Sequence, residues 1–128
     1  VSVIGIAVAN DSLFALSQAE LYKASLKSNL INYQVWGKEI LEAGKWSNLT
    51  IYKQNLWAIC DSVVVSHHEG TWDKTSSSLR WDKIVAQKDK FFVFNNQNHL
   101  YEMTDSLTFE PRYISGPIYY AIYEFEND

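Results

Sequence analysis

The sequence predicts an all-β protein built from about three four-stranded antiparallel meander repeats. Two positive observations support this prediction: a segment that recurs along the chain, and short β-type runs separated by polar turns. The third observation argues against helices, because apolar residues do not recur every 3.6 positions over any long stretch of the chain. The recurring segments are Ser12–Ser17, Asn55–Cys60 and Lys90–Asn95, each a turn residue followed by an apolar run that contains an aromatic side chain. Self-similarity of this kind indicates repeated supersecondary units.

Each recurring segment has a β-type run on both sides. The runs before it are residues 4–9, 49–52 and 84–86, and each ends in a polar turn, which is the pattern of a hairpin. Third strands are expected at residues 20–24, 62–66 and 99–103, and fourth strands with an aromatic residue at 33–36, 79–81 and 109–113. The predicted units therefore span about residues 1–45, 46–82 and 83–116.

Two further segments bear on this repeat. Residues 17–26 are the best helical candidate, but we expect a strand there because Leu21 and Tyr22 align with strand residues in the other two repeats. Residues 117–128 are expected to begin a further unit that is cut short. An unfinished sheet edge invites pairing, so contact with other copies or subunits is expected there.

The third unit carries a family likeness. Residues 81–94 and 100–109 resemble a β-propeller blade that ends in a degenerate Asp-box around Asp105. The second unit is similar, with Ser66 followed by Glu69, Gly70, Thr71 and Trp72. The first unit, with residues 21–25 and Trp36, resembles the blades of tachylectin-type lectins when residues 46–48 are included.

This resemblance implies propeller blades in which the acidic residue of the box caps turn amides and the glycine takes a positive φ. A propeller needs four to eight blades, so the chain is expected to be a fragment or to complete itself by oligomerisation. The alternative is a β-trefoil, which is complete at about this size. We favour blades because each unit has the pattern of an up-and-down meander.

Composition and charge narrow the range of partners. The 128 residues include 11 Lys plus Arg and 15 Asp plus Glu, and the net charge is −4. Nucleic acid is disfavoured, because phosphate neutralisation needs a concentrated basic footprint. The apolar runs are too short for a membrane-spanning helix. Cys60 is the only cysteine, so an internal disulfide is excluded.

The sequence contains no set of residues that indicates catalysis or a cofactor. His67, His68 and Glu69 suggest a metal site only weakly, because His99 is the one further histidine and the spacing fits no known ligand pattern. The histidine pair is instead expected to form a polar turn between the third and fourth strands of the second unit. Cys60 is expected to be a strand-end residue. Blades of the Asp-box type also occur in sialidases, and this resemblance would imply three substrate-binding arginines, whereas the chain has only Arg80 and Arg112. We therefore expect a protein that is not an enzyme and has no metal or cofactor.

Aromatic side chains are the best candidates for ligand contact, because aromatic rings stack on sugar rings. Most are expected in the core, but some lie at expected loops or outer strands. The predicted ligand-binding residues are Trp36, Trp72 and Trp81, with the acidic residues Asp105 and Glu69 of the turns.

These observations favour a non-enzymatic recognition or adhesin module that binds a glycan or a cell-surface receptor. The resemblance implies an extracellular or virion-surface location, as in a phage tail or fibre protein. One alternative is a structural propeller component of a larger complex. Another is a fragment of a glycoside hydrolase propeller, in which Asp61, Asp105 or Glu69 would be the carboxylates to test.

Overall fold

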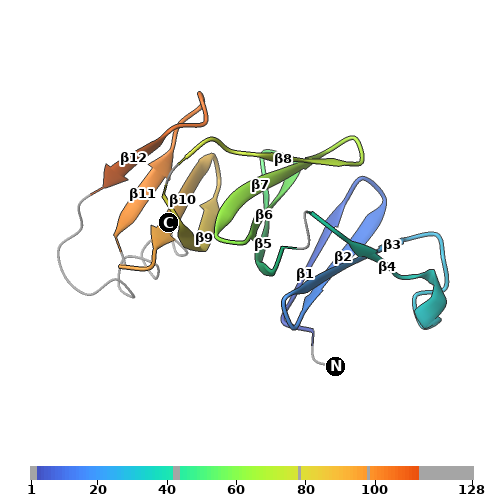
Figure 1. Cartoon of the computed structure of the whole chain (residues 1–128). Coiled ribbons are helices and arrows are strands. Elements are labelled where there is room, and N and C mark those ends of the chain that lie inside the picture. Colours follow the sequence, from blue (N-terminus) through green and yellow to red (C-terminus); the bar gives the residue numbers. More distant parts are fainter. Residues whose placement is uncertain (1–2, 42–43, 78, 98, 113–128) are drawn as a thin grey trace.

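The computed structural model describes residues 3–41, 44–77, 79–97 and 99–112, which form three four-stranded antiparallel sheets side by side (Figure 1). The first sheet contains β1 (Gly5–Ala9), β2 (Ser12–Ser17), β3 (Glu20–Ser25) and β4 (Gly37–Glu39). The second contains β5 (Trp46–Tyr52), β6 (Asn55–Cys60), β7 (Val63–His68) and β8 (Thr71–Lys74). The third contains β9 (Trp81–Gln87), β10 (Lys90–Asn95), β11 (Leu100–Met103) and β12 (Phe109–Arg112).

The predicted repeat is confirmed. Each sheet is a meander of four strands in chain order, and the recurring segments are β2, β6 and β10, the second strand of each sheet. Glu20–Ser25 is a strand, as its alignment predicts. Because each unit is a separate four-stranded meander, the arrangement is not that of a β-trefoil. The part of the chain that the structure describes contains no α-helix, and so none that crosses a membrane.

Two of the three expected fourth strands were wrong. Residues 33–35 form a short 3-10 helix, η1 (Tyr33–Val35), whose N-terminus is capped by the Asn32 side chain, and β4 follows it. In the second unit the fourth strand is β8, which joins β7 through the tight turn Glu69–Gly70. Trp81 instead begins β9, the first strand of the third sheet. The expected strand at 118–125 lies outside the described residues.

Most of the core consists of two layers of side chains, one between each pair of neighbouring sheets. A third, smaller cluster lies on the other face of the third sheet and contains Val85, Phe92, Phe94 and Leu100. Alternate residues of a strand point to opposite faces, so β6 contributes to both layers: Ala58 packs toward the first sheet and Ile59 toward the third. Both side chains have 0% exposure. The middle sheet is therefore covered on both faces, which explains why β6 is almost wholly apolar.

Backbone hydrogen bonds join successive sheets in the same way at both junctions. The amide of Trp46, at the start of β5, donates to the carbonyl of Ala19 in the first sheet's β2–β3 turn at 2.9 Å. The amide of Trp81, at the start of β9, donates to the carbonyl of Ser62 in the second sheet's β6–β7 turn at 2.8 Å. Both indoles are buried. Trp46 and Trp81 are thus equivalent residues of consecutive repeats.

Tight turns with two residues of positive φ connect many strands. They are Asn10–Asp11, Gln18–Ala19, Lys53–Gln54, Asp61–Ser62 and Glu69–Gly70. This geometry matches the type I′ hairpin turn, whose twist suits the flanking strands and which favours Asn, Asp and Gly. Alanine has no such preference, because its Cβ makes the left-handed conformation unfavourable.

Ala19→Gly is therefore expected to stabilise the protein by about 1 kcal/mol, because Ala19 has a φ of 67°. The carbonyl that accepts from Trp46 is retained in this variant. Ala7→Gly, within β1, is the matched control and is expected to destabilise by about 0.5–1 kcal/mol. Urea unfolding of the two variants measures both effects, and a loss of stability in Ala19→Gly would contradict the prediction.

Candidate functional site

A cleft of about 480 Å³ lies between the first and second sheets. Its walls come from the β1–β2 turn, the β3 strand, the start of β6 and the β7–β8 turn. Most of its lining side chains are polar: Asn10, Ser12, Lys23, Asn55, His67, His68 and Glu69. Binding sites for small molecules have volumes of about 300–1,000 Å³, so the cleft is large enough for a ligand of that class.

His67 is the most unusual residue of this cleft. Its side chain is only 5% exposed, and its ring packs edge-on against Phe14 and Trp72, with centroid distances of 5.3 and 4.8 Å. Neither ring nitrogen has a hydrogen-bond partner among the described residues. The carboxylate of Glu39 lies 3.9 Å from Nε2, beyond hydrogen-bond range.

Burial lowers the pKa of His67, and the nearby Lys23 and His68 act in the same direction, whereas Glu39 opposes them. The imidazole is therefore neutral at neutral pH, and it then carries one donor and one acceptor nitrogen. Buried polar atoms without partners are rare in native proteins. The unpaired imidazole lines the cleft, but both of its nitrogens are themselves buried, so a ligand in the cleft reaches them only if the cleft wall moves.

The alternation of β7 explains how His67 reaches this position. Val65 packs into the layer between the first two sheets, and Val64 into the layer between the second and third. His67 is two residues after Val65, so it points toward the first sheet as well. The sequence signal was a histidine at an inward position of an apolar strand, which the prediction read as part of a turn.

Of the predicted ligand-binding residues, only Glu69 lines this cleft. It occupies the β7–β8 turn with a φ of 49°, followed by Gly70 with a φ of 87°. The positive φ expected of this glycine is confirmed. The carboxylate of Glu69 approaches the ring of His68 at 4.0 Å.

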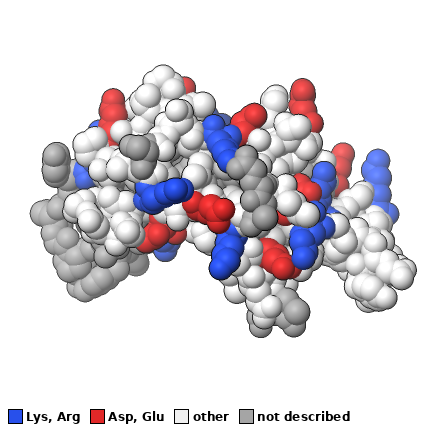
Figure 2. All heavy atoms as spheres, viewed as in Figure 1, with Lys and Arg blue, Asp and Glu red and all other residues white. Residues whose placement is uncertain are grey.

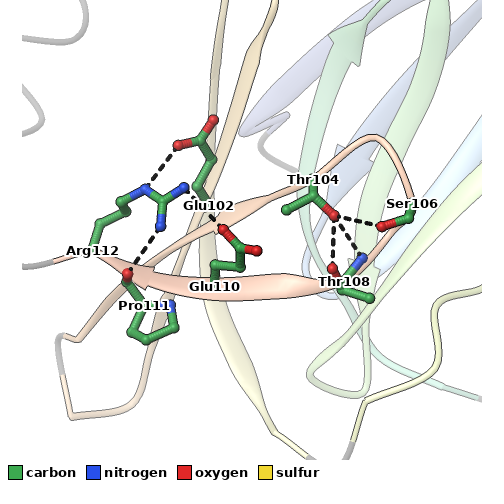
Figure 3. Close-up of polar contacts among 7 residues, drawn as sticks. All are labelled: Glu102, Thr104, Ser106, Thr108, Glu110, Pro111 and Arg112. Atoms are coloured by element: carbon green, nitrogen blue, oxygen red, sulfur yellow. Dashed lines mark hydrogen bonds and ion pairs between the residues drawn. The ribbon is translucent and has the colours of Figure 1, made fainter.

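Asp105 lies in the β11–β12 turn of the third sheet. The acidic capping expected of an Asp-box was wrong here, because the Thr104 hydroxyl accepts from the Thr108 amide and also bonds to the hydroxyls of Ser106 and Thr108 (Figure 3). Asp105 instead pairs with Lys53 of the second sheet at 3.0 Å. This hydrogen bond raises the pKa of Lys53.

The three predicted tryptophans occupy separate places. Trp81 is 1% exposed and packs against Tyr101 and Phe109, at centroid distances of 5.0 and 4.8 Å. It therefore has no free ring face. Trp72 is partly buried and packs on Trp46 at 4.8 Å. Trp36 is partly buried beside η1, and its indole N–H donates to the Leu30 carbonyl at 3.0 Å. The structure does not bring the predicted residues together in one site.

A second cleft, of about 640 Å³, lies where the second and third sheets meet near the β6–β7 turn. Its charged lining residues include Asp61, Arg80 and Asp82. Asp61 and Arg80 already make hydrogen bonds within the chain. Asp61 Oδ1 accepts from the Lys45 amide at 2.9 Å, and Arg80 donates to the Asp61 carbonyl at 3.0 Å. These bonds connect the β6–β7 turn to the segments that enter β5 and β9.

Charges elsewhere are mixed in sign. On the face shown in Figure 2, basic and acidic side chains are interspersed. Arg112 donates to Glu102 at 3.0 Å and to Glu110 at 3.2 Å (Figure 3). The hydrogen bonds to Glu110 and Glu102 raise the pKa of Arg112. Within residues 3–112, as far as they are described, no three His, Cys, Asp or Glu side chains gather closely enough to hold a metal ion.

Neither a scan against protein-family models nor a search of curated proteins finds a match for this sequence.

Proposed function

We propose that the chain is a non-enzymatic recognition module that binds a glycan in the cleft between its first and second sheets. The observation that carries this proposal is the buried His67, whose two ring nitrogens have no hydrogen-bond partner among the described residues and which lines a polar cleft. The proposal places the protein outside the cell or on a virion surface, with a glycan-bearing receptor as its partner.

The chemistry of the cleft suits a ligand that is rich in hydroxyl groups. A sugar hydroxyl both donates and accepts, so it can pair with the donor and the acceptor nitrogen of a neutral imidazole. The side-chain amides of Asn10 and Asn55 offer the same combination, and Lys23 adds a cation. Groups of this kind orient a polar ligand, while the aromatic rings behind His67 keep the imidazole in place.

The three sheets are, in this proposal, consecutive blades of the β-propeller type. Support comes from the matching meanders and from the layered packing between sheets. It also comes from the equivalent hydrogen bonds that the backbone amides of Trp46 and Trp81 donate to the preceding sheet. Single shallow sites of this size bind weakly, so several copies presented together would gain avidity.

A glycan array identifies the ligand class, and titration of the ¹⁵N-labelled chain with the best binder locates it. We expect chemical-shift changes at His67 and in the β1–β2 and β7–β8 turns. His67→Phe retains an aromatic ring but removes both nitrogens. It is expected to weaken binding at least about tenfold, which corresponds to the loss of about two neutral hydrogen bonds.

Lys90→Ala, at an exposed position of the third sheet, is the matched control and should leave the affinity unchanged. Binding that His67→Phe leaves intact, or shift changes confined to the third sheet, would refute the cleft as the site. An array with no binder at all would refute glycan recognition.

A further inference from the structure

The two junctions between neighbouring sheets are built from equivalent residues, so they can be compared position by position. Ala9 pairs with Ser12 at the end of β1, and Tyr52 pairs with Asn55 at the end of β5. Ala9 belongs to the layer between the first and second sheets, and Tyr52 to the layer between the second and third. Ala9 and Tyr52 therefore occupy the same place at successive junctions, and the cleft lies at the first of them.

At the second junction a tyrosine ring fills this place. Tyr52 is 7% exposed, and its ring centroid lies 5.1 Å from that of Phe91 and 6.3 Å from that of Trp57. Its hydroxyl donates to the carbonyl of Asp89, in the β9–β10 turn, at 3.0 Å. The side chain thus bridges the second sheet to a turn of the third.

The turns beside this place also differ between the junctions. At the second junction Lys53, in the β5–β6 turn, forms an ion pair with Asp105, in the β11–β12 turn, at 3.0 Å. The equivalent turn residues at the first junction are Asn10 and Glu69, and both line the cleft. Asparagine is neutral, so these two residues cannot form an ion pair that closes the first junction.

His67 marks a third difference. It pairs with Trp72 in the second sheet, as Met103 pairs with Phe109 in the third. Met103 is 4% exposed and belongs to the apolar layer between the second and third sheets. At the first junction an imidazole without a hydrogen-bond partner among the described residues therefore stands where the second junction has an apolar side chain.

These three differences all act against the stability of the first junction. The lining of an unfilled gap loses packing contacts, and a buried polar group without a partner costs free energy. The second junction shows that this repeat can close the same place with its own side chains. The first junction has a small or polar residue at each of the three positions, which is the pattern of a place kept for a ligand.

Building on the proposed function, we propose that Ala9 determines what the cleft admits: one sugar ring of the glycan occupies the place that the Tyr52 ring fills at the second junction. A sugar ring and a phenol ring are of similar size, and both carry a hydroxyl that can donate to a backbone carbonyl. Gln54, which precedes β6 as Asp89 precedes β10, is the equivalent turn residue at the first junction. Its carbonyl is the acceptor that corresponds to that of Asp89.

Ala9→Tyr tests this assignment, because it gives the first junction the side chain of the second. We expect its affinity for the best binder of the glycan array to fall at least about tenfold. Ala9→Ser keeps a small side chain at the same position and is the matched control, with an affinity within about twofold of the wild type. The polar residues that line the cleft are unchanged in both variants.

Two measurements without ligand show whether the new ring fills the place without disturbing the fold. The urea midpoint of Ala9→Tyr should be no lower than that of the wild type. The methyl signals of Leu56 should undergo a ring-current shift, because Leu56 follows Asn55 as Phe91, the neighbour of Tyr52, follows Lys90. A lower midpoint or unshifted Leu56 signals would show that the place is not open, and would overturn the proposal.

The binding results separate this proposal from the proposed function. If Ala9→Tyr binds the glycan as tightly as the wild type, or if Ala9→Ser loses as much affinity as Ala9→Tyr, the sugar ring does not occupy this place, although glycan recognition stands. If the wild-type chain binds no glycan, the proposed function fails, and this proposal fails with it.

Discussion

Replacing Trp81 with alanine is expected to lower the free energy of unfolding by about 3–5 kcal/mol. The indole is 1% exposed and lies in the layer between the second and third sheets, against Tyr101 and Phe109. Its removal leaves a cavity that the surrounding strands cannot close, because the hydrogen bond from the Trp81 amide to the second sheet holds the adjacent backbone in place. Urea denaturation measures this as a lower midpoint with an unchanged slope.

Trp36→Ala is the matched control, since Trp36 is only partly buried and has one side-chain hydrogen bond to the Leu30 carbonyl. Its substitution is expected to cost about 1 kcal/mol or less. Trp81→Phe should lower the free energy of unfolding by less than half as much as Trp81→Ala, because the indole nitrogen has no hydrogen-bond partner among the described residues. Equal losses for Trp81→Ala and Trp36→Ala would contradict the core role of Trp81.

Stability is expected to fall as the pH is lowered from about 7.5 to about 5, in part because of His67. Burial holds the pKa of the folded His67 below its usual value of about 6.5. As the pH falls through 6.5, the unfolded chain therefore takes up a proton that the folded chain does not. Through His67 the free energy of unfolding falls by at most about 1.4 kcal/mol for each pH unit. This fall ends once the pH is below the pKa of His67 in the folded chain.

His67→Phe isolates this contribution, because the variant retains an aromatic ring between Phe14 and Trp72 but cannot be protonated. We expect its free energy of unfolding to change less with pH than that of the wild type over this interval. The measurement is a series of urea titrations of both proteins at several pH values. Parallel pH profiles would show that the folded protein protonates His67 as readily as the unfolded chain does.

The candidate site could be predicted only in part. Glu69 was predicted from the sequence and lines the cleft, but Lys23, Asn10 and Asn55 were missed. Each is an ordinary polar residue in its own strand or turn, and they approach one another only because the first sheet packs on the second. Trp81 was misplaced for a related reason: its neighbourhood in the sequence is polar, whereas its neighbours in space are the aromatics Tyr101 and Phe109.

The amino-acid sequence by itself determined the three repeats and their second strands, because alternation and tight-turn residues act over a few positions along the chain. The fourth strand of the third sheet was also predicted, but the positions of β4 and β8 are set by pairing with β3 and β7 and were not encoded locally. Only the tertiary structure decided which sheet faces are covered, that Trp81 is buried, and that His67 meets the first sheet. These features arise from packing between sheets, which joins residues that are far apart in the sequence and that no local pattern relates.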